Sequence, residues 1–536
     1  MWKKKIGRLK ASDSCFTFYV SHFRGKLPTL NTCFRFCTLL CCIVLYSCGT
    51  PSTIEIPPPA PPKMSEAVQR LQAKIEATLN DPLLASSNVG VKIVSLETGE
   101  TLYEKDAEKL YHPASTMKLI TAATALVKLG PNYRFETTLY ADPVENSQIL
   151  GNIYLKGGGD PVFNTNDLEK MVERLMEMDT KDLQGDIIVD ETYFDAIRRG
   201  KGWMWDDGPI GGYYPHLSAL TINRNGVLVR ISPGNKVGDP ARVHLDPSTQ
   251  YMKIVNEATT VGQSEKTRLT IKRKDESTEE NVLMIDGVMA IGQPEMNRRV
   301  DVLDPALYCG TLLREILAKR GVTLQGKVRY GEVPEEATTI TKHVSPPLSR
   351  ILWEMNKPSD NLIAELLLKT IGAELRGAPG TAEKGLGAIS NLLGIIGMDR
   401  RYYTFADGSG VSRYNLVTAS LLTDLLVYMF HNFVVMPEYL ASLPVGGVDG
   451  TLTRRMRGMT AEGVLRAKTG TLRGLTALAG YTVTADGETV AFSIIMSNYH
   501  GSVSARRTLQ DKIGDILTQF SRQDSYEQLE KGKKEN

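Results

Sequence analysis

Cysteine is almost absent from the body of this chain. Six of the seven cysteines lie within the first 48 residues, and the rest of the 536-residue sequence contains only Cys309. An internal disulfide in the body is therefore excluded, and the apolar context of Cys309 predicts a buried core residue. The seven histidines are scattered without a His-Glu-x-x-His pattern, so the sequence predicts no metal site and no cofactor.

A basic surface is also lacking. The whole chain has a net charge of +2, but its first 47 residues hold eight Lys/Arg and one Asp, which leaves a net charge of −5 for the remainder. A mildly acidic body without a basic stripe argues against nucleic acid as a partner. The length indicates roughly two to four domains, and the hydrophobic fraction of 42% is ordinary for a globular protein.

A long hydrophobic run is missing as well. The N-terminal apolar run from Phe36 to Ser47 is short for a membrane-spanning helix and follows many basic residues, which predicts a signal peptide over 1–47. Its end, Leu45-Tyr46-Ser47-Cys48-Gly49, resembles a bacterial lipobox in which Cys48 is lipidated. Residues 48–63 are then predicted to be a Pro-rich linker that follows the lipidated cysteine. The protein is therefore expected to be an exported, periplasmic lipoprotein. The alternative is an uncleaved signal anchor.

Hydrophobic periodicity divides the remaining chain into three parts. Short alternating runs with many turn residues fill the middle, whereas helical patterns and longer strands occupy both ends. We expect the two end parts to fold together around one antiparallel sheet flanked by helices, with the middle inserted as β-rich domains. The predicted helices span about 65–79, 113–129, 348–374, 382–393 and 505–520, and the predicted strands span 89–95, 101–105 and much of 464–496.

Ser115 and Lys118 form the first of three motifs that suit catalysis. They stand at the start of a predicted helix, where positions i and i+3 share one face. A serine hydroxyl is a weak nucleophile that needs a base nearby, and a lysine serves as that base when burial and a neighbouring cation lower its pKa. Alone, the pair is a weak indication, because a long chain contains such pairs by chance.

The second and third motifs are Ser359-Asp360-Asn361 and Lys468-Thr469-Gly470-Thr471. Taken alone, the second predicts a helix start after Pro358. The third predicts an edge strand that an extended peptide can approach closely at the glycine. All three motifs, in this order, are typical of β-lactamases and penicillin-binding proteins, so their joint occurrence argues strongly against coincidence.

The chain resembles the class C low-molecular-mass penicillin-binding proteins, the D-alanyl-D-alanine carboxypeptidase/endopeptidase family (peptidase S13), over roughly residues 65–520. Ser359 follows Ser115 by 244 positions, a spacing similar to that produced by the large insertion of that family, and Lys468 follows Ser359 by 109 positions. Further similar stretches are 157–161, 217–220, 407–413 and 465–467.

The resemblance implies a multi-domain α/β (α+β) fold with a penicillin-binding, β-lactamase-like catalytic domain. We expect this domain at 64–139 plus 340–525, an inserted β-rich domain at 140–160 plus 240–339, a second inserted domain at 161–239, and a disordered tail at 526–536.

The resemblance also implies a role for each motif residue. Ser115 is the acylated nucleophile and Lys118 its base, whereas Ser359 relays a proton to the departing amine. Asn361 holds Lys118 and the substrate amide, and Lys468 supplies positive charge. The residues that complete the substrate-binding set are Asp360, Thr469, Gly470 and Thr471, with the backbone N–H groups of Ser115 and Thr471 as the oxyanion hole.

The function implied is a serine-type D-Ala-D-Ala carboxypeptidase with DD-endopeptidase activity on peptidoglycan stem peptides, inhibited by β-lactams. One alternative is a β-lactamase or related serine esterase, against which the large insertion argues. The other is a catalytically silent cell-wall-binding protein, against which the intact motif residues argue.

Overall fold

The structure, a computed structural model, describes residues 65–145, 148–149, 151–178, 182–203, 213–274 and 281–523. The predicted signal peptide, the lipidation site Cys48, the Pro-rich linker and the predicted tail lie outside these residues. In the part of the chain that the structure describes, no helix has both the length and the apolar composition needed to span a bilayer.

One antiparallel sheet joins the two ends of the chain, as the sequence predicted. Its strand order is β2-β1-β23-β22-β21, and every neighbouring pair is antiparallel. Because β21 is an edge strand, one side of its backbone has no strand partner within the sheet. The strands are β1 (Asn88–Ser95), β2 (Thr101–Lys105), β21 (Arg466–Leu472), β22 (Leu475–Val483) and β23 (Thr489–Ser497).

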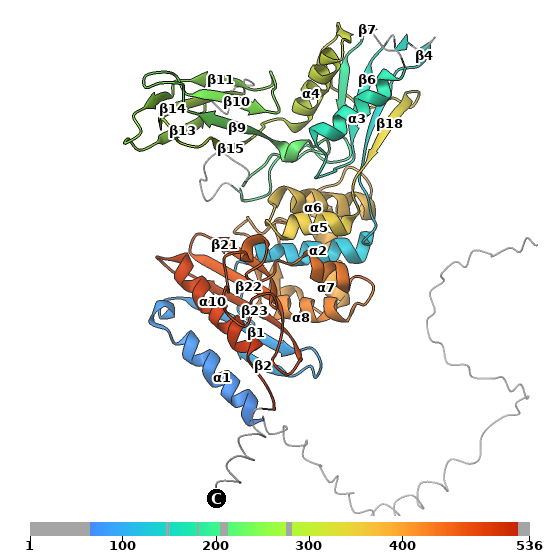
Figure 1. Ribbon diagram of the computed structural model, residues 1–536. Coiled ribbons are helices and arrows are strands. Elements are labelled where there is room, and N and C mark those ends of the chain that lie inside the picture. The colour runs from blue at the N-terminus through green and yellow to red at the C-terminus, as the bar shows by residue number, and fades with distance from the viewer. Residues whose placement is uncertain are drawn as a thin grey trace, which may run out of the picture. The chain divides into compact units, whose positions relative to one another are not determined.

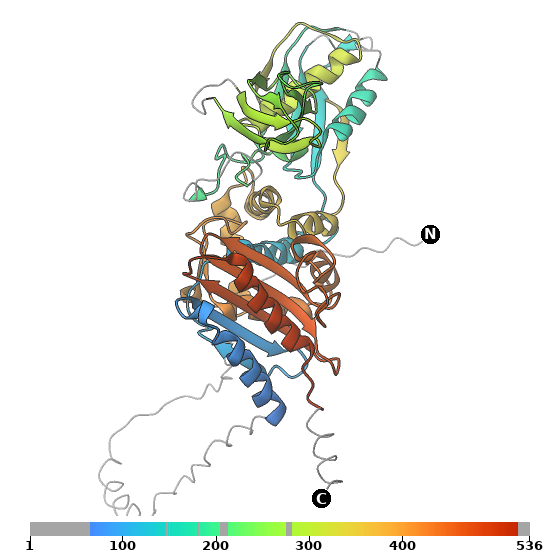
Figure 2. The same cartoon turned by 60° about the vertical axis from the view of Figure 1, so that its left-hand side comes forward.

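Helices cover both faces of this sheet (Figures 1 and 2). The N- and C-terminal helices α1 (Glu66–Leu79) and α10 (Val503–Thr518) pack together on one face over a shared apolar core. The other face carries α8 (Ala419–His431) and, beyond it, a larger core that includes α2 (Met117–Leu129). The other helices of this layer are α5 (Leu348–Asn356), α6 (Asn361–Arg376), α7 (Ala382–Ile395) and α9 (Met436–Ser442).

The middle of the chain forms further sheets. One of them has the order β17-β8-β6-β3-β18 and packs with two helices that periodicity did not predict, α3 (Thr165–Met176) and α4 (Pro305–Lys319). Cys309 lies fully buried on α4, which confirms its predicted core position. The strands are β3 (Glu136–Ala141), β6 (Ile153–Gly157), β8 (Ile187–Asp190), β17 (Val328–Tyr330) and β18 (Thr338–Val344).

Two smaller sheets lie between β8 and α4 in the sequence. Their orders are β10-β9-β15 and β11-β14-β12, with β13 also paired to β14. The boundaries that we gave the two inserted domains stay a prediction. The strands of these two sheets are β9 (Gly226–Ser232), β10 (Arg242–Asp246), β11 (Lys253–Asn256), β12 (Thr259–Val261), β13 (Arg268–Arg273), β14 (Val282–Ala290) and β15 (Met296–Asp301). Two-residue strands elsewhere in the described residues are β4 (Val144–Glu145), β5 (Gln148–Ile149), β7 (Asp182–Leu183), β16 (Thr323–Leu324), β19 (Tyr403–Thr404) and β20 (Leu416–Val417).

Candidate active site

Ser115 sits in a single tight turn, the 3₁₀ segment Ala114–Thr116, that leads directly into α2. The preceding residue, Ala114, has a φ of 45°, which a side chain other than glycine rarely adopts. Gly410 packs against this turn, and a Cβ added to it would lie 1.8 Å from the Ala114 carbonyl oxygen. The close packing of Gly410 therefore helps to hold Ala114 in its strained conformation, which sets the position of Ser115.

Lys118 lies one helical turn after Ser115 and is fully buried. Its Nζ is 3.1 Å from Ser115 Oγ and 2.7 Å from Asn361 Oδ1, and it also donates to the Ser409 carbonyl oxygen at 2.6 Å. Burial lowers the pKa of Lys118 to about 8, although nearby carboxylates, of which Asp407 has the largest effect, act in the opposite direction. A neutral amine, able to accept a proton from the serine, is therefore available near physiological pH.

The second motif forms the turn between α5 and α6. Asp360 caps α6 by accepting a hydrogen bond from the Ile363 amide at 3.0 Å, which confirms the predicted helix start. Ser359 has a φ of 67°, and Asn361 is the first helical residue. Asn361 accepts from Lys118 through Oδ1 and donates from Nδ2 to the Tyr213 carbonyl oxygen at 2.9 Å.

The third motif lies on the edge strand β21, as predicted. Lys468 is fully buried, and its Nζ donates to Ser359 Oγ at 2.8 Å. Burial, reinforced by the charge of Lys118, holds the pKa of Lys468 well below its usual value. Gly470 lies so close to the turn that contains Ser115 that an added Cβ would be 2.7 Å from the Pro113 carbonyl oxygen.

These residues surround one pocket with a volume of about 490 Å³. Ser115, Ser359, Asp360, Asn361, Thr469 and Thr471 line it, whereas Lys118 and Lys468 are buried beside it. The structure thus brings all three motifs together.

Two arginines in the pocket wall were not found by sequence reasoning. Arg455 follows the turn at Gly450–Leu452, and Arg507 lies on α10. Arg507 donates to Thr471 Oγ1 at 2.9 Å, and Arg455 has a buried Nη1 without a hydrogen-bond partner. Neither arginine stands near a recognisable motif, so no local pattern indicated its position.

Two buried carboxyl groups complete the surroundings of Lys118. Glu365 Oε1 accepts from the backbone amides of Gly408 and Ser409 at 2.9 and 2.7 Å. Asp407 accepts from the Gly410 amide at 2.8 Å and from the Trp203 indole at 2.9 Å. Burial, followed by the charge of Asp407, raises the pKa of Glu365 to about 8. Within the 407–413 stretch, this network holds the Ser409 carbonyl oxygen where it accepts a hydrogen bond from Lys118.

Comparisons with known proteins identify the family of the chain. The model of the D-Ala-D-Ala carboxypeptidase 3 (S13) family matches residues 71–520. A D-alanyl-D-alanine carboxypeptidase from an Actinomadura species is 36% identical over 482 residues, 86% of this chain and 88% of that protein. The D-alanyl-D-alanine carboxypeptidase DacB of Haemophilus influenzae is 26% identical over 427 residues, 78% of this chain and 88% of that protein.

A solved structure extends the likeness to the fold. The crystal structure of penicillin binding protein 4 from Haemophilus influenzae matches with a TM-score of 0.71 and 26% identity, covering 84% of this chain and 98% of that one. The predicted fold class and the predicted enzyme class, a D-Ala-D-Ala carboxypeptidase, are confirmed. The chain belongs to the D-Ala-D-Ala carboxypeptidase 3 (S13) family.

Proposed function

We propose that Ser115 is the nucleophile of a DD-peptidase that removes the terminal D-alanine of peptidoglycan stem peptides and also cuts D-Ala–meso-diaminopimelate cross-links. The observation that carries this proposal is the contact of buried Lys118 with Ser115 Oγ at 3.1 Å, at the wall of the pocket that the three motifs share. β-Lactams, which acylate such serines, are the expected inhibitors.

Acylation begins when neutral Lys118 accepts the proton of Ser115 Oγ and this oxygen bonds to the carbonyl carbon of the penultimate D-alanine. The backbone N–H groups of Ser115 and Thr471 stabilise the negative charge that develops on the carbonyl oxygen. The C–N bond then breaks, and the proton that Lys118 took from Ser115 passes through Ser359 to the departing amine, while Lys468 Nζ holds Ser359 Oγ by a hydrogen bond of 2.8 Å. In the second half of the reaction a water molecule gives one proton to neutral Lys118 and bonds to the acyl carbon. The proton then returns from Lys118 to Ser115 Oγ as the ester bond breaks and the shortened peptide leaves.

The positive wall of the pocket is suited to the carboxylate beside the bond that breaks. Thr469 and Thr471 line the pocket next to Arg507, and Arg455 adds a second guanidinium that is paired with Asp511 at 2.7 Å. In a stem peptide this carboxylate belongs to the terminal D-alanine, and in a cross-link it belongs to the D-centre of diaminopimelate. One site therefore suits both the carboxypeptidase and the endopeptidase reaction, since both leaving groups present an amine next to a free carboxylate.

We further propose that the protein is exported and held at the membrane by lipidated Cys48. The support is the basic and apolar N-terminal pattern that ends in Leu45-Tyr46-Ser47-Cys48-Gly49. Mass spectrometry of the mature N-terminus tests this: a diacylglyceryl-modified Cys48 supports the anchor, and a mature chain that retains its leader contradicts it.

Labelling with a fluorescent penicillin tests the nucleophile. The wild-type protein should form a stable covalent adduct, Ser115→Ala should form none, and the exposed serine of the control variant Ser86→Ala should leave labelling unchanged. Labelling that survives Ser115→Ala contradicts the assignment. Rapid turnover of the adduct would indicate a β-lactamase, and an unlabelled wild-type protein would indicate a silent wall-binding protein.

Mass analysis of the products from purified muropeptides tests the substrate. Loss of a single D-alanine from monomeric pentapeptides reports the carboxypeptidase reaction, and conversion of cross-linked dimers to monomers reports the endopeptidase reaction. Dimers that stay intact while pentapeptides are trimmed would contradict the endopeptidase part of the proposal.

A further inference from the structure

A short segment of the insertion has a backbone conformation that side chains normally avoid. Asn223, Arg224 and Asn225 have φ values of 51°, 55° and 57°, all in the left-handed region. Three consecutive residues other than glycine persist in this region only where surrounding contacts hold them. The segment lies at the start of β9, and its middle residue points its side chain toward the catalytic domain.

The two asparagines fix this turn from both sides. Buried Asn225 donates from Nδ2 to the His216 carbonyl oxygen at 2.7 Å. Asn223 accepts from the Thr165 amide at 3.0 Å and donates to the Thr165 hydroxyl at 2.8 Å. These contacts hold the backbone of the turn and do not involve the Arg224 side chain.

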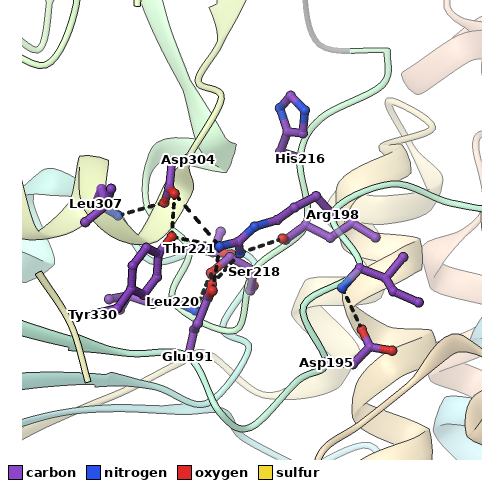
Figure 3. Close-up of polar contacts among 12 residues, drawn as sticks. Glu191, Asp195, Arg198, His216, Ser218, Leu220, Thr221, Asp304, Leu307 and Tyr330 are labelled. Carbon is purple, nitrogen blue, oxygen red and sulfur yellow. Dashed lines mark hydrogen bonds and ion pairs between the residues drawn. The ribbon is translucent and has the colours of Figure 1, made fainter. Parts of the chain in front are cut away.

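The segment around Ser218, just before the turn, makes a second group of contacts with other parts of the insertion (Figure 3). Ser218 Oγ donates to Glu191 at 2.6 Å, and the Arg198 guanidinium pairs with the same carboxylate. Arg198 also donates to the Tyr330 hydroxyl at 2.8 Å, and that hydroxyl donates to Asp304. Contacts with several elements of the insertion therefore stabilise the backbone that leads into the Asn223–Asn225 turn.

Arg224 reaches two carboxylates on either side of the turn between α5 and α6. One guanidinium nitrogen donates to Asp360, and the other donates to Glu354 Oε2 at 2.6 Å. Glu354 lies on α5, Asp360 caps α6, and Ser359 stands between them with its own positive φ. All three paired side chains are mostly buried, at 25% exposure for Arg224 and Glu354 and 19% for Asp360.

We infer that Arg224 is a positioning residue that holds the Ser359–Asn361 turn in its reactive geometry, so that a residue of the insertion supports the active site from outside the pocket. Arg224 acts through Asp360 and Glu354, and it does not line the pocket in the described residues. The planar guanidinium bridges two carboxylates at once, which a lysine ammonium on its flexible stem does not reproduce with the same geometry. This inference rests on the proposed roles of Ser359 and Asn361.

Two variants of Arg224 test the inference by the rate of penicillin acylation and by kcat and KM for a D-Ala-D-Ala peptide. Arg224→Met keeps an unbranched side chain without the charge, and it should lower the acylation rate constant and kcat by about 10-fold to 100-fold with little change in KM. Arg224→Lys should retain an intermediate rate. The matched control is Arg230→Met, because Arg230 pairs with Asp246 on the surface of the same insertion and should show the wild-type rate.

A double-mutant cycle separates positioning from a general loss of stability. Asp360→Asn keeps a side chain able to cap α6 but removes the charge that Arg224 binds. If the contact matters for positioning, the Arg224→Met and Asp360→Asn losses should be far from additive. Additive losses, or wild-type acylation by a folded Arg224→Met protein, would overturn the inference.

The outcomes also distinguish this inference from the proposed function. A wild-type protein that is not labelled at Ser115 contradicts the proposed function itself. A wild-type protein that is labelled, together with Arg224 variants that acylate equally fast, contradicts only the positioning role. Should Arg224→Met fail to fold, Arg224→Lys and Asp360→Asn carry the same test, with melting temperatures to verify their folding.

Discussion

The buried position of Lys118 leads to a quantitative prediction about pH. With a pKa of about 8, about one-tenth of Lys118 is neutral at pH 7, whereas a lysine at its ordinary value would be neutral in about one molecule in 3,000. The neutral form is the one that accepts the Ser115 proton. Burial therefore increases the reactive population at pH 7 about 300-fold.

The sign of the pH dependence follows from that protonation. The acylation rate constant should rise about tenfold per pH unit below pH 7. It should reach half of its maximum near pH 8 and level off above about pH 9. Acylation by a fluorescent penicillin, stopped at timed intervals and quantified on gels between pH 6 and 9.5, gives this profile directly.

A profile that is flat between pH 6 and 9 would refute Lys118 as the proton acceptor. Circular dichroism at each pH serves as the control, because a folded-state change would otherwise imitate a titration. A midpoint near pH 10 would instead show that the amine is far better solvated than its full burial and its contacts with Asn361 and Ser409 indicate.

Three further predictions concern the surroundings of the nucleophile. Gly410→Ala should lower the acylation rate by about 100-fold or more, because the new Cβ displaces the turn that contains Ser115. The control variant Gly99→Ala is also at a positive φ, but its new Cβ lies in open space. It should only lower the free energy of unfolding, by about 1–2 kcal/mol, as measured by thermal unfolding. Glu365→Gln should shift the midpoint of the acylation profile to lower pH, since its carboxyl raises the pKa of Lys118, and an unmoved or higher midpoint contradicts this. Arg507→Ala should reduce kcat/KM for D-Ala-D-Ala peptides by about 10-fold to 100-fold through loss of a charge-assisted contact, and an unchanged value would remove the arginine from substrate binding.

Local patterns predicted many elements of the catalytic domain but not its helices α8 and α9. The helix at 65–79 and the strands at 89–95 and 101–105 agree with α1, β1 and β2 to within a residue. The helix buries one face at helical spacing, and the Glu97-Thr98-Gly99 turn separates the two strands. The predicted helix 348–374 is divided at Lys357–Asp360, where Pro358 and the strained Ser359 make the turn. In the insertion, α3 and α4 were missed because the surrounding short strands and turn residues dominated the pattern.

The sequence by itself determined the candidate catalytic side chains, since short motifs that need no knowledge of contacts contain Ser115, Lys118, Ser359, Asn361 and Lys468. Only the tertiary structure decided what surrounds these residues. The low pKa of Lys118 arises from burial, and Glu365, Arg507 and Arg224 reach the site from separate elements across long stretches of chain. An arginine on an amphipathic helix or in a loop looks the same in sequence whether it faces water or a catalytic turn, and folding alone makes that distinction.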